Sequence, residues 1–341
     1  MCTGIHTELC ADEENELQQT GTGRRSLLKG AAAAVAGAAT VGVTGALGAP
    51  ASAVESSDEG QGALHRVPPS RISIQMYTVR DAAAADLPGT LQALRDIGYR
   101  RIETAGFYGR TPAQFKAELD RVGIRATSNH IGIPQPFDAA AWSEALDAAV
   151  LLGSWFINHP FFGYDFAGSG AEREASVWAA FARDLNKAGK MARARGIRLG
   201  YHNHHHEFLP VAGSNARRLT AYDVLERTID PRYVHLQMDL FWVTRGAHDP
   251  VDEIRKARKL YNLDVPQFHV KDMSATFDPG IPFEDPGRGL IDFGRIFRLA
   301  PLADTREWIV ERDDAGVAPR TPEMSLDTAR VGYEFLRNIR F

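Results

Sequence analysis

Short apolar runs rich in β-branched residues alternate with longer segments of helical period from residue 71 to the C-terminus. This alternation predicts βα units and a parallel sheet. We expect strands at Ile72–Tyr77, Arg101–Thr104, Arg125–Asn129, Trp155–His159, Arg198–His202, Val234–Asp239, Gln267–Lys271 and Trp308–Glu311. The helices expected around them are Leu87–Ile97, Pro112–Val122, Ala139–Leu152, Ala175–Arg195, Pro250–Tyr261, Asp292–Leu299 and Pro322–Asn338.

The number and order of these elements favour an α/β fold of the (β/α)8 TIM-barrel type, as a single domain over residues 69–341. Eight βα units in about 270 residues is the usual size of such a barrel. The competing fold is an open doubly wound sheet, but no G-x-G-x-x-G motif follows the first strand. Gly98, Gly123 and Gly196 stand where we expect helices to end before a new strand.

The N-terminal segment is typical of an export signal. Paired arginines at 24–25 precede an alanine- and glycine-rich run and an A-x-A site at 51–53. This arrangement resembles a twin-arginine signal, so we expect residues 1–53 to be removed during export to the periplasm or the medium. A membrane anchor is the alternative, but alanine and glycine contribute little to insertion, so we expect no stable membrane insertion after cleavage. Residues 54–68 read as a polar linker.

Composition and charge exclude several classes of function. The chain has 39 Lys and Arg against 43 Asp and Glu, a net charge of −4, and 44% hydrophobic residues. An undirected nucleic-acid binder would need a positive surplus, so we expect no nucleic-acid partner. The cysteines are Cys2 and Cys10, both outside the expected barrel, which excludes a disulfide framework or a cysteine nucleophile within it.

Polar side chains gather at the C-terminal ends of the expected strands, where barrels carry their active sites. They are Gln75, Tyr77, Glu103, His130, His159, His202, Asp239, His269, Lys271 and Glu311. A single residue of this kind is more often structural. A set that recurs on nearly every strand instead indicates a functional site.

Three of these residues suggest a metal site. Asp239, His269 and Glu311 end the sixth, seventh and eighth strands, and one imidazole with two carboxylates suits a divalent ion such as Mn, Co, Zn or Mg. The fifth strand runs into the sequence YHNHHHEF at 201–208. There His202 and His204 point to the same side. His202 is therefore the natural fourth ligand, with His204 or Glu207 near the metal or the substrate.

The chain resembles the sugar phosphate isomerase/epimerase superfamily, the xylose isomerase-like TIM barrels that share their fold with endonuclease IV. The segments that carry the resemblance are Ile74–Arg80, His202–Phe208, Met238–Trp242, Gly246–Pro250, His269–Met273, Gly287–Phe293 and Val310–Asp313. They are spread over residues 71–340. A nuclease of the endonuclease IV type would need more metal ligands than these strands supply, and the charge and the export signal disfavour it.

The resemblance implies a metal-dependent enzyme. Better-known epimerases of the superfamily hold the metal by Glu, Asp, His and Glu from the last four strands, and use the two glutamates as acid and base on opposite faces of the substrate. Asp239, His269 and Glu311 match the last three ligands, whereas His202 stands where the first Glu is expected. This departure puts the symmetrical two-carboxylate exchange in doubt, although Glu207 could restore it.

We therefore expect a sugar isomerase or epimerase that removes a proton next to the carbonyl of a ketose or oxo-sugar, through a metal-bound enediolate. The alternatives are a metal-dependent lyase or hydratase acting on 3-oxo-glycosides or inositol-like ketones, and a non-catalytic carbohydrate-binding protein. The candidate catalytic residues are Glu311, Glu207, Lys271 and His204. The candidate substrate-binding residues are Gln75, Glu103, His130 and Trp242. Lys271 could instead be an ion-pair partner, and Trp242 could be barrel packing.

Overall fold

A computed structural model of the chain describes residues 65–165, 170–212, 219–275, 282–300 and 302–341. Its parallel strands are β1 (Ile72–Ile74), β2 (Arg101–Thr104), β3 (Arg125–Asn129), β4 (Phe156–His159), β7 (Arg198–His202), β8 (Val234–Asp239), β9 (Gln267–Val270) and β12 (Glu307–Val310). Its α-helices are α2 (Arg80–Ala85), α3 (Leu87–Ile97), α4 (Pro112–Val122), α5 (Ala139–Leu152), α6 (Ala175–Ala194), α7 (Ala221–Thr228), α8 (Leu240–Arg245), α9 (Pro250–Leu260), α10 (Phe293–Leu299) and α11 (Pro322–Asn338). Shorter elements are the 3-10 turns η1 (Pro69–Arg71), η2 (Met76–Val79) and η3 (His205–Phe208), and the hairpin strands β5 (Tyr164–Asp165), β6 (Gly170–Ala171), β10 (Asp272–Met273) and β11 (Phe283–Glu284).

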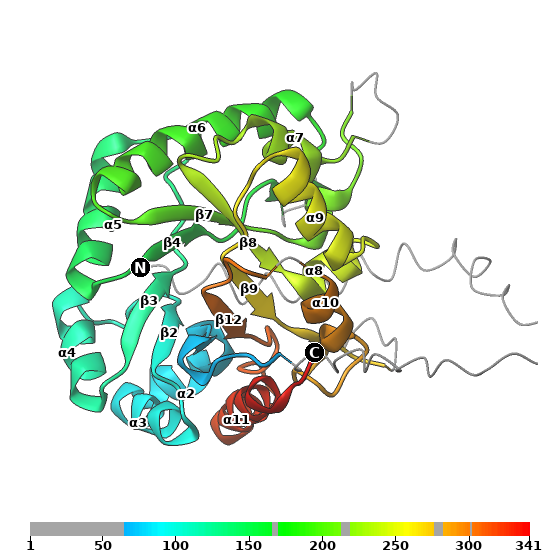
Figure 1. Ribbon diagram of the computed structural model, residues 1–341. Helices are drawn as coiled ribbons and strands as arrows, with labels where there is room; N and C mark the ends of the chain where they lie inside the picture. The colour runs from blue at the N-terminus through cyan, green and yellow to red at the C-terminus, as the bar shows by residue number, and fades with distance from the viewer. Residues whose placement is uncertain (1–64, 166–169, 213–218, 276–281, 301) are drawn as a thin grey trace, which may run out of the picture.

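The parallel strands form a curled sheet in the middle of the molecule, with the helices outside it (Figure 1). Six strands are ordered β1-β12-β9-β8-β7-β4, and β2 pairs with β3. Single bridges between Gln75 and Glu103, and between His130 and Asn158, join this pair to the strands on either side. The arrangement fits the α/β TIM-barrel fold that the alternation along the chain predicts.

All eight predicted strands are present, with small shifts at their ends. The largest shift is in β1, which ends at Ile74 rather than Tyr77. There the side chain of Gln75 accepts a hydrogen bond from the Tyr77 amide at 3.1 Å and begins the turn η2. A side chain that bonds its own backbone in this way ends the strand early.

Helix boundaries follow local capping chemistry. Helix α4 starts at a capping box in which Thr111 and Gln114 exchange side-chain and backbone hydrogen bonds, with Pro112 in the first turn. It ends at Gly123, which adopts the left-handed conformation with φ 67°. Gly98 and Gly196 also have positive φ beyond helix ends, as predicted.

The described chain also contains helices that the sequence analysis does not predict. Helices α2, α7 and α8 have six, eight and six residues, too few turns for a clear helical period. Helix α8 begins immediately after β8, because Asp239 Oδ1 accepts a hydrogen bond from the Trp242 amide at 2.8 Å. This cap holds Oδ1 of Asp239 in place. The other oxygen, Oδ2, faces His202 and Lys271.

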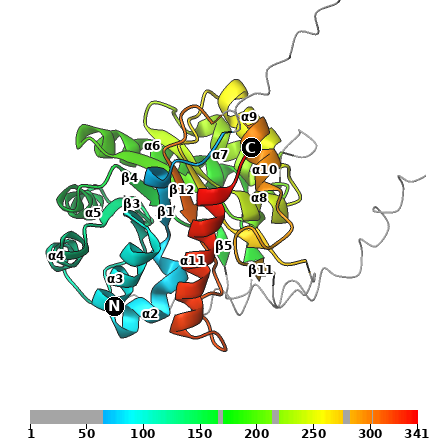
Figure 2. The ribbon, with the colours of Figure 1, turned by 60° about the horizontal axis from the view of Figure 1, so that its bottom comes forward.

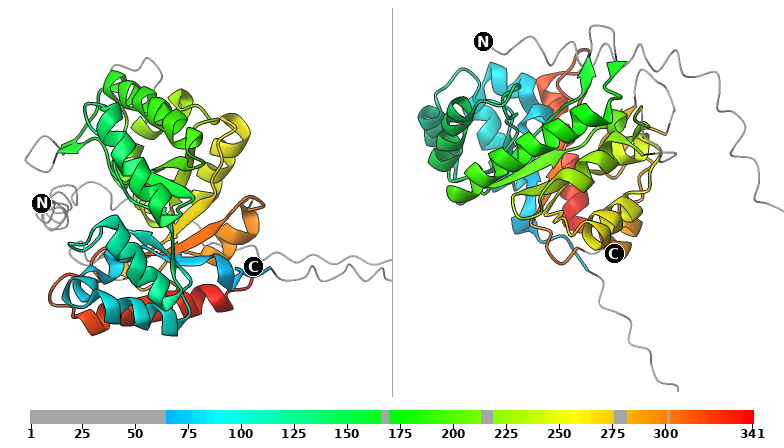
Figure 3. Two further views of the ribbon diagram at one scale, coloured as in Figure 1. Left: turned by 90° about the vertical axis from the view of Figure 1, so that its left-hand side faces the viewer. Right: turned by 90° about the horizontal axis from the view of Figure 1, so that it is seen from above.

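The hydrophobic core is formed by residues of the strands and of the helices, and two further views show these helices outside the sheet (Figure 3). Helix α6 illustrates the pattern. It buries Trp178, Phe181, Leu185, Ala188 and Ala192, spaced three or four residues apart. That spacing places all five on one face of the helix.

The two ends of the described chain meet. Helix α11, red in Figure 2, packs along α2 and α3 from the start of the fold. His65 and Phe341 exchange two backbone hydrogen bonds, at 2.7 and 3.2 Å. The predicted signal peptide (1–53) and most of the linker (54–68) lie outside the described residues. Among the described helices, none combines the length and apolar character that crossing a bilayer requires.

The inside of the curled sheet is polar rather than apolar. Glu103, Asn158, Gln237, Gln267 and Glu307 are fully buried there. They bond one another and nearby hydroxyls; Gln267 Nε2, for example, donates to Glu307 Oε2 at 2.9 Å and to Ser128 Oγ at 3.0 Å. Buried polar groups need such partners. Donors on the inward face of one strand therefore lie opposite acceptors on another.

Gly200 of β7 gives a test of this close interior packing. A Cβ atom at position 200 would lie 2.1 Å from Asn158 Oδ1 and 2.4 Å from His235 Nε2. We therefore expect Gly200→Ala to lower the free energy of unfolding by about 1–3 kcal/mol, the usual cost of overpacking. Urea denaturation is the measurement. Gly294→Ala in α10, where the nearest atom is 3.4 Å away, is the control and should leave stability unchanged or slightly raised.

Candidate metal centre

Four of the strand-end side chains converge on one point. His202 and Asp239 are the last residues of β7 and β8, His269 lies in β9, and Glu311 directly follows β12. One ligand atom from each lies within 4.8 Å of those of the other three, and all four residues are buried. Parallel strands bring their C-terminal ends to one edge of the sheet, which is why residues far apart in sequence meet here.

His269 is held between two carboxylates. Its Nδ1 lies 2.5 Å from Glu311 Oε2, and its Nε2 lies 2.7 Å from Glu103 Oε2. Burial alone would lower the pKa of His269, but the two carboxylates outweigh burial and raise this pKa to about 10. In the absence of a metal, His269 is therefore an imidazolium at neutral pH.

His202 is a neutral imidazole that faces Asp239. Its Nε2 lies 3.9 Å from Asp239 Oδ2, and its Nδ1 lies 3.1 Å from Gln237 Oε1. Burial, together with the neighbouring His269 and His130, holds the pKa of His202 well below its ordinary value. A neutral imidazole keeps a lone pair for a metal ion.

Lys271 supplies a buried positive charge beside the ligands. Its Nζ lies 2.7 Å from Asp313 Oδ1, 3.1 Å from Glu311 Oε2 and 3.2 Å from Asp239 Oδ2. Burial would lower the pKa of Lys271, but these carboxylates raise it well above its ordinary value. The same ammonium lies 5.0 Å from the centre of the Trp242 ring. Lys271 is thus an ion-pair partner, as one reading of the sequence expects, and it carries a positive charge.

The chemistry of the four ligands fits a divalent transition metal. Two imidazoles and two carboxylates suit Mn, Co or Zn, whereas Mg prefers sites made of oxygen alone. Asp239 Oδ2 is buried and, among the described residues, receives no hydrogen bond, although the Lys271 ammonium lies near it. A buried carboxylate oxygen without a donor is a favourable position for a cation.

The two other candidates from the fifth strand lie apart from this cluster. The carboxyl of Glu207 accepts a hydrogen bond from the Tyr201 hydroxyl at 2.5 Å, and burial raises the pKa of Glu207 well above its ordinary value. Burial therefore favours the neutral form of Glu207, and Glu207 is not among the converging ligands. The ring of His204 packs 5.0 Å from His202 and 5.2 Å from Trp242, between the cluster and the indole.

The candidate substrate residues have different positions. Gln75 and Glu103 are fully buried and bond each other, Gln75 Nε2 donating to Glu103 Oε2 at 2.8 Å. Trp242 is 1% exposed, with His204, His205 and Lys271 near its ring, so it presents no open face to a sugar. His130 is partly exposed and stacks 5.1 Å from His269. Of these four, His130 alone lines the edge of the cluster with part of its side chain open.

Three functional neighbours escaped the sequence analysis. They are Gln237, Asn158 and Asp313, which contact the candidate site residues. The sequence analysis includes Asp313 within the segment Val310–Asp313, but it proposes none of the three as a site residue. A usable signal was present in the two-residue period of strands: Gln237 precedes Asp239 by two positions and therefore shares its face. Asp313 likewise follows Glu311 by two positions.

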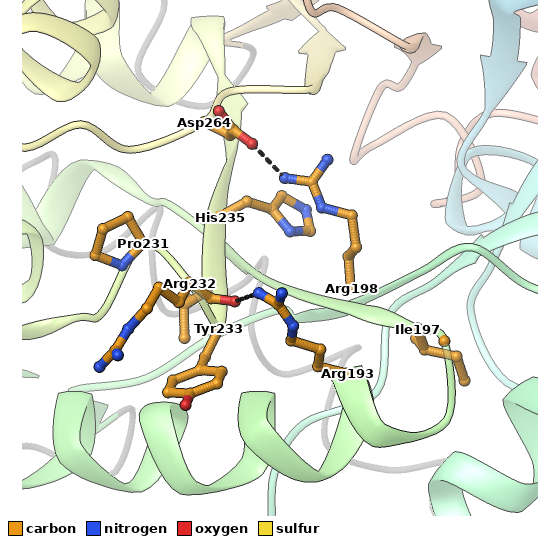
Figure 4. A pocket seen from close by; sticks show the side chains of 10 residues that line it. Arg193, Ile197, Arg198, Pro231, Arg232, Tyr233, His235 and Asp264 are labelled. Atoms are coloured by element: carbon orange, nitrogen blue, oxygen red, sulfur yellow. Dashed lines mark hydrogen bonds and ion pairs between the residues drawn. The ribbon is translucent and has the colours of Figure 1, made fainter.

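A separate pocket lies at the opposite ends of the same strands. It has a volume of about 320 Å³ and is lined by Arg193, Arg198, Arg232, His235 and Asp264 among others (Figure 4). Its arginines already have partners: Arg198 pairs with Asp264, Arg193 donates to the Arg232 carbonyl, and Arg232 pairs with Asp230. This pocket is therefore not part of the candidate metal centre.

Fold and site together define an α/β barrel-type protein with a polar centre at the strand ends. The sequence model of the xylose isomerase-like TIM barrel family matches residues 91–337. The chain therefore belongs to this family, which confirms the resemblance at the level of the superfamily.

Individual proteins similar to this chain include inosose dehydratases. That of Salmonella typhimurium is 29% identical over 237 residues, which is 62% of this chain and 76% of the relative. That of Clostridium tetani is 26% identical over 159 residues, and the chain spans about half of its length (50%). A sugar phosphate isomerase/epimerase from Parabacteroides distasonis has a similar structure, with a TM-score of 0.63, 21% identity, and coverage of 79% of this chain and 94% of that one.

Metal binding should release protons, because the Nδ1 of His269 carries one in the metal-free protein. With a pKa of about 10, His269 is protonated at pH 7 and must lose this proton when a metal takes its place. Zinc binding at pH 7 should therefore release at least about one proton per site, and the apparent affinity should rise about tenfold per pH unit. Calorimetry in buffers of different ionisation enthalpy measures this release. Binding that shows no proton release between pH 6 and 8 would contradict the assignment.

Proposed function

We propose that this protein is a divalent-metal-dependent enzyme that removes a proton next to the carbonyl of a polyhydroxy ketone or oxo-sugar. The observation that carries the proposal is the convergence of His202, Asp239, His269 and Glu311. When bound there, a divalent ion would polarise the carbonyl and stabilise the negative charge that develops as the neighbouring C–H bond breaks. Membership of the xylose isomerase-like family supports this reading.

The charge states of the neighbouring groups support an acid–base pair. Burial would raise the pKa of Glu311, but Lys271 and His269 hold it well below its ordinary value, so Glu311 is an ionised proton acceptor. Lys271 is an ammonium and so holds a proton, and the carboxylates that raise its pKa make it a weaker acid than a free lysine. The two groups are 3.1 Å apart, so one site offers both a base and an acid.

The asymmetry of this pair favours elimination. Glu311 takes the proton from the carbon next to the carbonyl, a C=C bond forms, and the C–O bond to the β-substituent breaks. Lys271 gives its proton to the departing oxygen, which leaves as water or as an alcohol. The proton taken by Glu311 then returns to Lys271, so no other reactant is consumed.

Two observations support our proposal of a dehydratase or lyase in preference to an isomerase or epimerase. A two-carboxylate exchange needs a second ionised carboxylate, but His202 stands at that position. Glu207 is buried, its pKa is raised, and it is not among the converging ligands. The relatives named inosose dehydratases perform a loss of water on a ketone. Isomerisation or epimerisation is the second candidate, because Glu311 serves both reactions until the C–O bond breaks.

The proposal also includes a cellular location and a partner. The paired arginines and the A-x-A site of residues 24–53 support export by the twin-arginine route, which carries folded proteins. A small sugar or oxo-sugar is the proposed partner.

Metal content gives the first test. Purified protein loaded with Mn, Co or Zn should hold about one ion per chain, and Glu311→Gln should weaken binding by more than about 100-fold, because it removes a ligand. Elemental analysis and titration provide the measurement. The control is Glu334→Gln, which removes the same charge from an exposed ion pair with Arg330 on α11 and should bind like the wild type. A wild type that takes up none of these ions would favour a non-catalytic carbohydrate-binding protein.

Substrate trials test the reaction itself. We expect metal-loaded protein in deuterated buffer to exchange the proton next to the carbonyl of a cyclic polyhydroxy ketone or 3-oxo-glycoside, and to form an unsaturated ketone. Lys271→Met should keep the metal but lower the rate of elimination by about 100-fold or more, because the acid is lost. NMR and ultraviolet absorbance follow the two events. Exchange with formation of an epimer, and no unsaturated product, would support the isomerase or epimerase instead.

A further inference from the structure

The carboxylate of Glu103 lies at the centre of the curled sheet and is surrounded by polar side chains from five other strands or their ends. Its Oε1 accepts from Ser128 Oγ at 2.6 Å, Asn158 Nδ2 at 3.0 Å and Gln237 Nε2 at 2.6 Å. Its Oε2 accepts from Gln75 Nε2 at 2.8 Å, and His269 Nε2 and His130 Nε2 lie 2.7 and 3.0 Å from it. Glu103 is 0% exposed, so it has no contact with solvent or substrate.

An ionised carboxylate can only accept hydrogen bonds, and each of these partners must therefore donate. The non-titrating partners of Glu103 show the same: the Ser128 hydroxyl and the amide nitrogens of Asn158 and Gln237 donate to Oε1, and the amide nitrogen of Gln75 donates to Oε2, so both oxygens act as acceptors. The consequence for His269 is direct. Its Nε2 must carry a hydrogen, which leaves Nδ1 as the nitrogen that faces Glu311.

The second consequence passes through Gln237. The amide nitrogen of Gln237 donates to Glu103, so its oxygen must point the other way, toward the histidines. Gln237 Oε1 lies 3.1 Å from His202 Nδ1 and 2.7 Å from His130 Nε2. Since an amide oxygen only accepts, His202 carries its hydrogen on Nδ1 and presents Nε2 to Asp239.

We infer that Glu103 is a positioning residue that fixes which ring nitrogen each histidine presents to the metal, directly for His269 and through Gln237 for His202. The two rings then bind the ion by opposite nitrogens, Nδ1 of His269 and Nε2 of His202. His130 is oriented by the same pair of acceptors, with its hydrogen on Nε2. The inference rests on the metal site of the proposed function.

The competing explanation is that Glu103 only holds the strands together. Glu307 separates the two explanations, because it is also a fully buried interior carboxylate. It bonds Thr127 at 2.5 Å, Gln267 at 2.9 Å and Arg101 at 3.4 Å, and none of its hydrogen bonds is to a histidine among the described residues. A purely structural role predicts the same effect for both carboxylates.

The unmodified protein gives the first test, which needs no variant to fold. Zinc-loaded protein labelled with ¹⁵N in its histidines is measured by long-range ¹H–¹⁵N correlation, which identifies the protonated and the metal-bound nitrogen of each ring. We expect two rings to change on zinc binding, one bound through Nδ1 with hydrogen on Nε2, the other bound through Nε2 with hydrogen on Nδ1. Two rings bound through the same kind of nitrogen would overturn the inference.

The variants test the cause. Glu103→Gln places an amide NH₂ among donors, and we expect it to weaken zinc binding by about 10–100-fold and to disturb both ring signals. Gln237→Met removes the acceptor of His202 and His130 and one donor to Glu103, but it leaves the Glu103 carboxylate beside His269. It should therefore change the His202 signal and leave the hydrogen of His269 on Nε2. Glu307→Gln is the matched control and should keep wild-type affinity and both ring signals.

Each remaining outcome is decisive. Equal weakening by Glu103→Gln and Glu307→Gln, or wild-type affinity and spectra in Glu103→Gln, would overturn the positioning role while leaving the metal site intact. If Glu103→Gln does not fold, the wild-type spectrum and Gln237→Met still decide. A wild type that binds no zinc, manganese or cobalt would instead overturn the proposed function, and this inference with it.

Discussion

The burial of the Glu103 charge is the constraint on which the rest of this site depends. An isolated carboxylate inside a protein is very costly, and it is tolerated only when its oxygens are surrounded by donors. Here the donors come from β3, β4, β8 and β9 and from the residues that follow β1 and β3. One carboxylate therefore sets the relative positions of strands that are distant in sequence, and through them the positions of the metal ligands.

The interior is organised in layers along the strands. Near the strand starts, Glu307 is bonded to Arg101 and Gln267, and in the middle Glu103 is bonded to amides and imidazoles. At the strand ends lie the ligand set and Lys271 with Asp313. Hydrogen bonds join these layers: Asn158 Nδ2 donates to Gln267 Oε1 and to Glu103 Oε1, and His269 Nε2 lies 2.7 Å from Glu103 Oε2. The ligands therefore lie next to a hydrogen-bonded polar layer. Rigid support of this kind is what a metal site needs to hold its geometry.

Much of the fold could be predicted from the sequence, because strand and helix periods are local properties. The glycine helix ends and all eight strands follow from such local patterns, whereas α7 and α8 are too short to show a period. The convergence of His202, Asp239, His269 and Glu311 was also predictable, since a parallel barrel brings all strand ends together. The depth at which each residue lies along its strand could not be predicted. Glu103 and Gln75 share an inward face with the converging residues, yet they lie deeper in the sheet, and no pattern along the sequence separates the two levels.

The fifth strand shows how a local rule can mislead in a dense cluster. The sequence placed His204 and Glu207 beside His202 as possible acid–base groups, but the chain leaves the strand after His202 and turns into η3. That turn carries the Glu207 carboxyl to the Tyr201 hydroxyl, where burial raises its pKa and so favours its neutral form. At the ligand cluster, the Lys271 ammonium lies between the carboxyl groups of Glu311 and Asp239. A base and an acid side by side, rather than two equivalent carboxylates, suit a reaction in which a proton and an oxygen leave neighbouring carbons. The replacement of a carboxylate by His202 and the withdrawal of Glu207 thus act in the same chemical direction.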